Sequence, residues 1–168
     1  MRQVLIRRGE AVVEEVPAPT IEPGYLLVRL QRSCVSIGTE GASLANSGLP
    51  LWKRALQHPQ EVKKVLETAA TIGISRTRSM VEGRLEAGAP VGYSAAGIVL
   101  KVGAGCQTFK PGDRVACAGA QFANHAEVIR VPPKLTAAIP DNLNSDVAST
   151  VTLGAIALQG VRRAEPTM

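Results

Sequence analysis

The chain has few aromatic residues and no long apolar run. Only 3% of its 168 residues are Phe, Trp or Tyr, whereas 45% are hydrophobic. The core must therefore be built mainly from Val, Ile, Leu and Ala. No apolar run approaches the length of a bilayer-spanning helix, and the opening MRQVLIRRGEAVVEEV lacks the uninterrupted hydrophobic region of a signal peptide. These absences predict a globular, cytoplasmic protein with no membrane partner.

Cysteine is scarce as well. Cys34, Cys106 and Cys117 are odd in number, lie far apart and include no CxxC pair. Neither a disulfide framework nor a structural zinc knuckle is therefore expected.

The formal charge of +5 comes partly from one segment. Residues 52–86 hold seven Lys or Arg against four Asp or Glu. Base-stacking aromatics are missing, so we interpret this segment as a solvated helix face and expect no nucleic-acid partner.

Short runs rich in β-branched residues and Leu, separated by Gly and Pro, predict strands in the first and last parts of the chain. The expected strand segments are 2–9, 11–17, 25–38, 95–105, 112–119, 124–132 and 136–141. Apolar residues at helical spacing predict helices over 58–73 and 75–88, and a further helix over 145–165. Many short strands with an inserted helical pair indicate a compact, barrel-like β domain.

Three motifs, taken in order, carry a resemblance to a known family. They are VSIGTEG, VGYSAAGIVLKVGAGCQTFKPGDRVACAG and NHAEVIRVPPKLTAAIPDNLNSDVASTVTLGAIALQG. Apart from the helical segment, nearly the whole chain resembles the N-terminal, GroES-like domain of the medium-chain alcohol dehydrogenase and reductase superfamily. More narrowly, SIGTEG, the helical segment and GYSAAG are similar to the bi-domain oxidoreductases of bacterial polysaccharide clusters.

The resemblance implies a mainly β, α+β fold for residues 1–168: a GroES-like, partly open barrel with a helical insertion at 49–89 and a C-terminal helix. In the superfamily, NAD or NADP is held between this domain and a nucleotide-binding domain, which this chain lacks. Gly103 and Gly105 do not supply a dinucleotide fingerprint, because Thr108 stands where the third glycine belongs and no βαβ unit surrounds them. We interpret these glycines as a turn.

This chain has other residues at the positions where zinc-dependent members of the superfamily have their zinc ligands. The resemblance places Ile37, Tyr93 and Ser94 at the three catalytic-zinc positions. Zinc takes thiolate, imidazole or carboxylate ligands, so we expect no metal. The four-cysteine lobe of a structural zinc is also absent between Val115 and Phe122.

Cys34 is a poor substitute ligand. On an extended strand its offset of three residues from Ile37 would point it to the opposite face, so we interpret it as a buried, inert thiol. His125 and His58 are lone histidines, and we expect them to be a strand residue and a helix-cap residue.

Without a metal, hydrogen-bond donors must stabilise a developing negative charge. The resemblance places Thr39 at the hydroxyl residue of a proton relay, and we expect Tyr93 to donate to an oxyanion or act as a general acid. The alternative is that Tyr93 fills the vacated metal cavity with its hydroxyl bound to the backbone. Ser36, Glu40 and Ser94 are candidate substrate contacts.

Thr152 and Gly154 are the candidate cofactor-binding residues. By resemblance, TVTLGAIA is the start of the interdomain helix, where Thr152 would lie near the nicotinamide and Gly154 would allow close backbone approach. The alternative is a plain helix interface made of small residues.

Together these features predict the substrate-side domain of a zinc-independent, NAD(P)-dependent oxidoreductase for a small-molecule substrate, and the resemblance implies a sugar or nucleotide-sugar precursor. We expect the chain to be a fragment that is inactive alone, and we name a homodimer as a candidate assembly. The insertion, with Leu49, Leu51 and Trp52 at its entrance, would form a lid or a domain interface. The rival hypothesis is a GroES-like binding or assembly module without redox chemistry.

Overall fold

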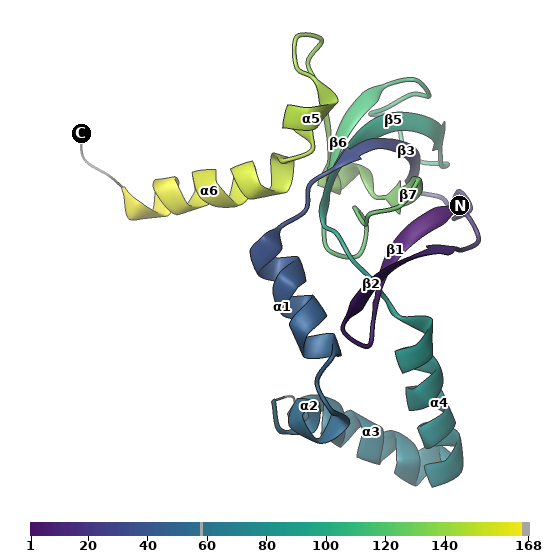
Figure 1. Ribbon diagram of the computed structural model, residues 1–168. Coiled ribbons are helices and arrows are strands. Elements are labelled where there is room, and N and C mark those ends of the chain that lie inside the picture. Colours follow the sequence, from purple (N-terminus) through teal and green to yellow (C-terminus); the bar gives the residue numbers. More distant parts are fainter. Residues whose placement is uncertain (58, 166–168) are drawn as a thin grey trace. The chain divides into compact units, whose positions relative to one another are not determined.

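The structure, a computed structural model, describes residues 1–57 and 59–165. The prediction for His58 therefore lies outside the described residues. The elements are labelled in Figure 1, and contacts between residues group them into two compact units. Unit 1 comprises residues 1–4, 13–35 and 90 onward, whereas unit 2 comprises residues 5–12 and 36–89.

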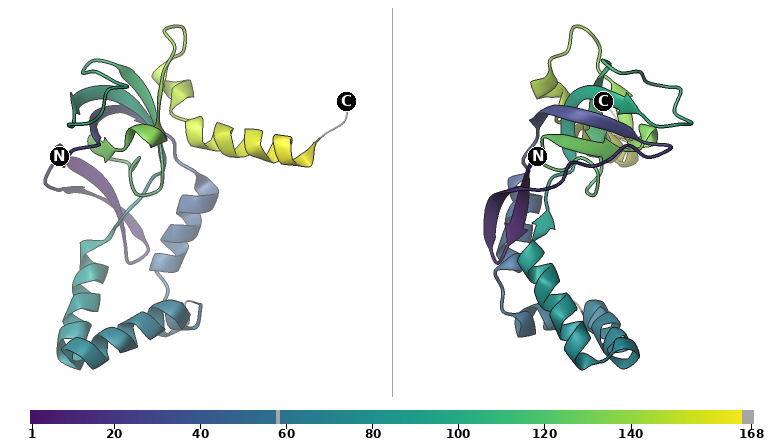
Figure 2. Two further views of the ribbon diagram at one scale, coloured as in Figure 1. Left: turned by 180° about the vertical axis from the view of Figure 1, so that it is seen from behind. Right: turned by 90° about the vertical axis from the view of Figure 1, so that its right-hand side faces the viewer.

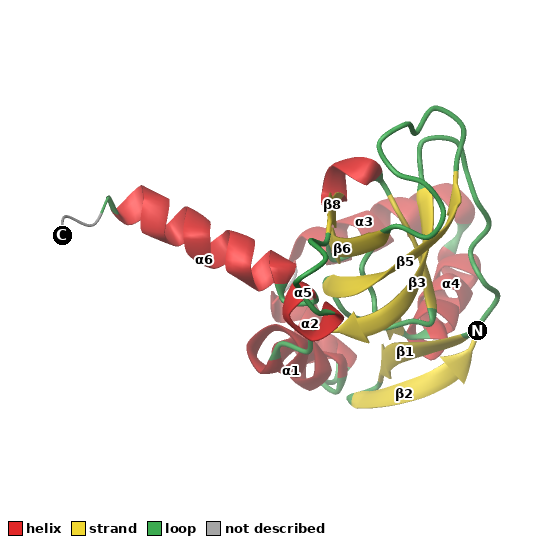
Figure 3. Cartoon of the chain, turned by 90° about the horizontal axis from the view of Figure 1, so that it is seen from above, coloured by secondary structure: helices red, strands yellow, loops and turns green. Residues whose placement is uncertain are grey.

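Unit 1 is built on an antiparallel sheet in the order β7-β3-β5-β6-β8, of which Figure 3 labels β3, β5, β6 and β8. Its strands are β3 (Leu26–Ser33), β5 (Ser94–Val102), β6 (Arg114–Ala118), β7 (Val128–Val131) and β8 (Thr136–Ala138). Because β7 and β8 are the two edges, the described sheet is open and does not close into a barrel. This confirms the predicted α+β class with a partly open sheet.

A second sheet has the order β2-β1-β4. Its strands are β1 (Arg2–Arg7), β2 (Glu10–Glu15) and β4 (Ala89–Pro90). Arg8 and Gly9 form the tight turn of the β1–β2 hairpin, both with positive φ angles, of 50° and 87°.

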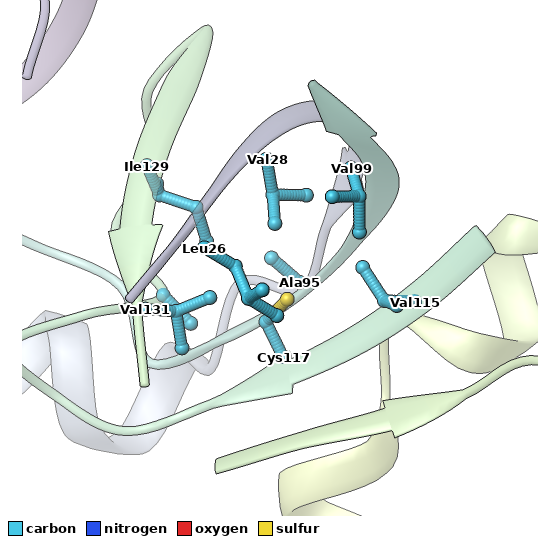
Figure 4. Packing of buried hydrophobic residues seen from close by; sticks show 9 residues of the cluster. Leu26, Val28, Ala95, Val99, Val115, Cys117, Ile129 and Val131 are labelled. Carbon is cyan, nitrogen blue, oxygen red and sulfur yellow. The ribbon is translucent and has the colours of Figure 1, made fainter. Parts of the chain in front are cut away.

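The main core of unit 1 is aliphatic, as the shortage of aromatics predicts (Figure 4). It consists of Leu26, Val28, Ala95, Val99, Val115, Cys117, Ala123, Ile129 and Val131. A smaller cluster of Ala96, Ala116, Ile139 and Ala148 is also buried. Since successive residues of a strand point to opposite faces, Ala95 and Ala96 belong to different clusters and β5 is buried on both faces.

Gly97 fills a position where no side chain fits. A Cβ built at Gly97 would lie 2.2 Å from the carbonyl oxygen of Arg29. Gly97 pairs with Leu30, and the β3–β5 register shifts between Leu30 and Arg32. The bulged β3 backbone therefore crosses β5 closely, which accounts for the last residue of the SAAG motif.

The described residues of unit 2 form four helices where the sequence predicted two. They are α1 (Ile37–Ser47), α2 (Leu51–Gln57), α3 (Pro59–Ile72) and α4 (Ile74–Ala87). The expected helices over 58–73 and 75–88 are confirmed, and Gly73, with a φ of 91°, forms the bend between them (Figure 2).

The predicted strand over 25–38 is wrong at its end. Strand β3 stops at Ser33, and α1 begins at Ile37. The carboxylate of Glu40 accepts a 3.0 Å hydrogen bond from the backbone N–H of Ser36, so local polar contacts favour a helix start at this point.

The helices of unit 2 leave apolar side chains uncovered. Of the expected anchors of the insertion, Leu49 is half-buried and Trp52 is 63% exposed, while the side chain of Leu51 lies outside the described ones. Leu56 and Leu66 are 76% and 64% exposed.

The predicted C-terminal helix is divided in two. A short helix α5 (Ser145–Ala148) is followed by α6 (Val151–Ala164), and the helical turn η1 (Pro133–Leu135) precedes β8. Val151 packs on the smaller core cluster, whereas Ile156 and Val161 are 63% and 56% exposed. In the described part of the chain, each helix is too short or too polar to cross a bilayer.

Candidate functional site

The start of β5 is held by a tightly packed turn. Gly92 has a φ of 109°, and a Cβ there would lie 2.7 Å from the backbone nitrogen of His125. That nitrogen donates a 2.8 Å hydrogen bond to the carbonyl oxygen of Val91. Because only glycine fits this conformation and this gap, the turn fixes the position of Tyr93 directly before β5.

Ser94 is fully buried, and its hydroxyl is used twice within unit 1. Its Oγ donates to the carbonyl oxygen of Ser149 at 2.6 Å and accepts from the backbone N–H of Thr152 at 3.1 Å. Ser94 therefore ties the first residue of β5 to the junction between α5 and α6. Its predicted contact with a substrate stays a prediction.

Tyr93 is half-buried, and its backbone carbonyl and its phenolic hydroxyl have different environments. Its carbonyl oxygen accepts from the backbone N–H of Gly119 at 2.9 Å and from Thr152 Oγ1 at 3.0 Å. Among the described residues its phenolic hydroxyl has no hydrogen-bond partner, and both interpretations of Tyr93, as a proton donor and as a filler of the cavity, stay predictions. A hydroxyl in this state can donate to a ligand.

Thr152 and Gly154 lie in the first turn of α6. The hydroxyl of Thr152 is bound to Tyr93, so these two predicted residues are brought together. Gly154 is exposed, and a Cβ built there would meet no atom within 4 Å. A planar group of a ligand could therefore approach the backbone of α6 at Gly154.

The other three predicted residues belong to unit 2, around the start of α1. Ser36 Oγ lies 3.4 Å from Thr39 Oγ1, and Glu40 accepts from the N–H of Ser36. Thr39 is exposed, and Ser36 and Glu40 are half-buried. Ile37, at the first expected zinc position, is 88% exposed.

The side chains at the three expected zinc positions do not fit a zinc ion. An alkyl group, a phenol and an engaged serine hydroxyl supply none of the usual donors. Within the residues that the structure describes, no three side chains of His, Cys, Asp or Glu gather into a metal-binding group.

The cysteines differ in environment. Burial raises the pKa of the Cys117 thiol to about 12, and a hydrogen bond with Thr136 opposes this rise. Cys117 is thus an unreactive core residue. Cys34, which we predicted to be buried on the strand, is only half-buried and follows the end of β3.

Sequence reasoning missed the polar surroundings of His125. Its Nδ1 lies 2.8 Å from Ser33 Oγ, and both line a hollow of about 340 Å³ within unit 1. The rest of the lining comprises Arg2, Gln3, Val4, Val13, Leu30, Gln31, Arg32, Ala126 and Glu127. The pKa of Glu127 is lowered, first because its carboxylate accepts from the backbone N–H of Arg2. The expectation that His125 is a strand residue is wrong, because His125 lies in a bend before β7. Ser33, the last residue of β3, had no motif to mark it.

Two solved structures show that the fold is a known one. A quinone oxidoreductase from Coxiella burnetii matches 98% of this chain and 45% of its own length, with a TM-score of 0.68 and 16% identity. A mycobacterial protein, Rv1454c, complexed with NADPH, matches 99% of this chain and 42% of its own, with a TM-score of 0.63 and 22% identity. Other structures with this fold are named as enoyl reductases, a 2-haloacrylate reductase and a butanediol dehydrogenase. At such identities the likeness establishes the fold alone.

A curated relative matches a shorter stretch. The reducing polyketide synthase FUB1 of Gibberella fujikuroi is 42% identical over 65 residues, which are 36% of this chain and 2% of that protein. No known protein-family profile matches the chain. The chain thus spans a small part of this relative and less than half of each of the two matched structures.

Proposed function

We propose that the chain is the substrate-side part of an NAD(P)-dependent oxidoreductase that works without zinc. The observation that carries the proposal is the fold, shared over nearly the whole chain with a structure named as a quinone oxidoreductase and with another that is complexed with NADPH. The zinc-free part of the proposal is supported by the donor chemistry of Ile37, Tyr93 and Ser94.

Tyr93 is the proposed proton donor. A bound reduced nicotinamide would supply the hydride to a substrate carbon. The negative charge that develops on the substrate then needs a donor, and the phenol of Tyr93 is unengaged within the described chain. Its proton would pass to the substrate, and solvent would restore it. Thr39 is proposed as a hydroxyl relay, and Ser36 and Glu40 as substrate contacts.

The cofactor contact is assigned to the first turn of α6. The open backbone at Gly154 leaves room for a nicotinamide ring, and Thr152, two residues earlier in the same turn, is bonded to the carbonyl oxygen of Tyr93. The helical insertion is proposed as a lid or a domain interface, because its apolar side chains are uncovered.

Two substrate classes are open to test. A sugar or nucleotide sugar follows from the resemblance of SIGTEG and GYSAAG. The names of the structural neighbours favour instead an activated double bond or a quinone. A panel containing quinones, enoyl thioesters and nucleotide sugars, assayed by NADH and NADPH oxidation, separates the two classes.

The test compares the chain with a protein that includes a nucleotide-binding part. We expect the coding sequence beyond residue 168 to continue with a strand and a GxGxxG loop, and the longer protein to oxidise NADH or NADPH with one substrate class. Residues 1–168 alone are expected to be inactive. Tyr93→Phe in the longer protein should lower turnover by about a hundredfold or more. Full activity of that variant would disprove the role of Tyr93.

The rival hypothesis, an assembly module without redox chemistry, predicts a different particle. A ring of several copies in size-exclusion chromatography would support the module. A monomer or homodimer, which we expect, would support the oxidoreductase fragment.

A further inference from the structure

Helix α6 begins without a cap of its own. The first N–H groups of a helix lack partners inside the helix, and the residue before the first turn commonly supplies one. That residue here is Thr150, whose side chain makes no capping bond. Its hydroxyl donates instead to the carbonyl oxygen of Val147 at 2.8 Å.

The missing cap comes from a strand. The N–H of Thr152, the second residue of α6, donates to Oγ of Ser94 on β5, 58 residues earlier in the chain. Since Ser94 is fully buried, water does not compete for this bond. The proton of the Ser94 hydroxyl is directed to the carbonyl oxygen of Ser149, so the serine oxygen serves as donor and acceptor at once.

Thr152 donates a second hydrogen bond to the same segment. Its Oγ1 donates to the carbonyl oxygen of Tyr93 at 3.0 Å. Thr152 thus donates two hydrogen bonds, one from its N–H and one from its hydroxyl, to the adjacent residues Ser94 and Tyr93, which are distant from it in the sequence. With Gly119 also donating to it, the carbonyl oxygen of Tyr93 has both of its acceptor positions filled.

We propose that Ser94 and Thr152 are positioning residues that hold the Tyr93 peptide against the first turn of α6. The phenol is then aligned by the helix and not by a metal. This inference rests on the proposed function only in one respect, the role of the Tyr93 phenol as proton donor. The clamp itself, formed by Ser94, Thr152 and the Tyr93 peptide, is a property of this chain.

The test uses fluorine NMR of the 168-residue chain labelled with meta-fluorotyrosine. The chain has two tyrosines, Tyr25 and Tyr93, so Tyr25→Phe assigns the two signals. Thr152→Val removes the bond to Tyr93 and should shift or broaden the Tyr93 signal. Thr152→Ser keeps the hydroxyl and should restore it. Thr150→Val is the matched control, because its hydroxyl bonds only within the α5–α6 junction, and it should leave the Tyr93 signal in place.

Amide exchange tests the capping half of the clamp. In Ser94→Ala the Thr152 amide should exchange about tenfold faster or more, whereas amides of β3 should not change. If Ser94→Ala fails to fold, the Thr152 pair carries the test alone. An unchanged Tyr93 signal in Thr152→Val, or an equal change in Thr150→Val, would overturn the proposal. Neither measurement needs cofactor or substrate, so failure of the oxidoreductase assignment would be seen separately.

Discussion

At the scale of single residues, close approach of the backbone decides where glycine is required. Gly97→Ala would place a methyl group 2.2 Å from the carbonyl oxygen of Arg29, and both strands would have to shift. We expect a loss of about 2 kcal/mol or more in the free energy of unfolding, measured by urea denaturation. The matched control is Gly160→Ala in α6, where a Cβ meets nothing, and a gain of roughly 0.5–1 kcal/mol is expected. Equal effects of the two substitutions would refute this explanation of the SAAG motif.

The buried thiol of Cys117 makes stability depend on alkaline pH. Its pKa rises from an ordinary value of 9.0 to about 12 in the folded chain. Above pH 9 the unfolded chain therefore loses this proton while the folded chain keeps it, and stability falls as pH rises toward 12. The slope is at most about 1.4 kcal/mol per pH unit.

The free energy of unfolding is measured at a series of pH values, beginning about one unit below the ordinary pKa and ending about one unit above it. Cys117→Ala should show a shallower decline than the parent chain. Identical slopes would mean that other groups cause the decline. In the folded parent at neutral pH, a maleimide should label Cys34 and Cys106 before Cys117.

At the scale of elements, the helices of unit 2 show how little burial a helix can have. Leu66 on α3 is 64% exposed, so Leu66→Lys removes almost no packing. We expect the free energy of unfolding to change by less than about 0.5 kcal/mol, and association at high protein concentration to decrease because an apolar patch is reduced. Analytical ultracentrifugation measures the association. Val99→Ala in β5, which is buried, should by contrast destabilise the chain clearly.

At the scale of the whole molecule, the prediction concerns metal. A protein that binds a metal only when folded is stabilised by it. We expect EDTA and added zinc to leave the thermal midpoint of the chain unchanged, and elemental analysis to find less than one zinc per chain. A midpoint that rises with zinc concentration would show a metal site and would contradict the zinc-independent mechanism.

The sequence by itself determined the composition of the core, the α+β class and the donor chemistry at the expected zinc positions. Each depends on residue types and local spacing alone: aliphatic residues replace scarce aromatics, and periodicity marks the helices over 58–73 and 75–88. The same local reasoning extended β3 to residue 38, because alternation along a strand does not reveal where polar contacts start a helix.

Only the tertiary structure decided what the polar residues near Tyr93 do. Ser94 and Thr152 are separated by 58 positions, and no periodicity or motif indicates that one caps the helix of the other. The same holds for Ser33 beside His125 and for the Arg29 backbone beside Gly97. A hydrogen bond or a close contact depends on distances of a few ångströms, and the packing of strands, helices and turns sets those distances.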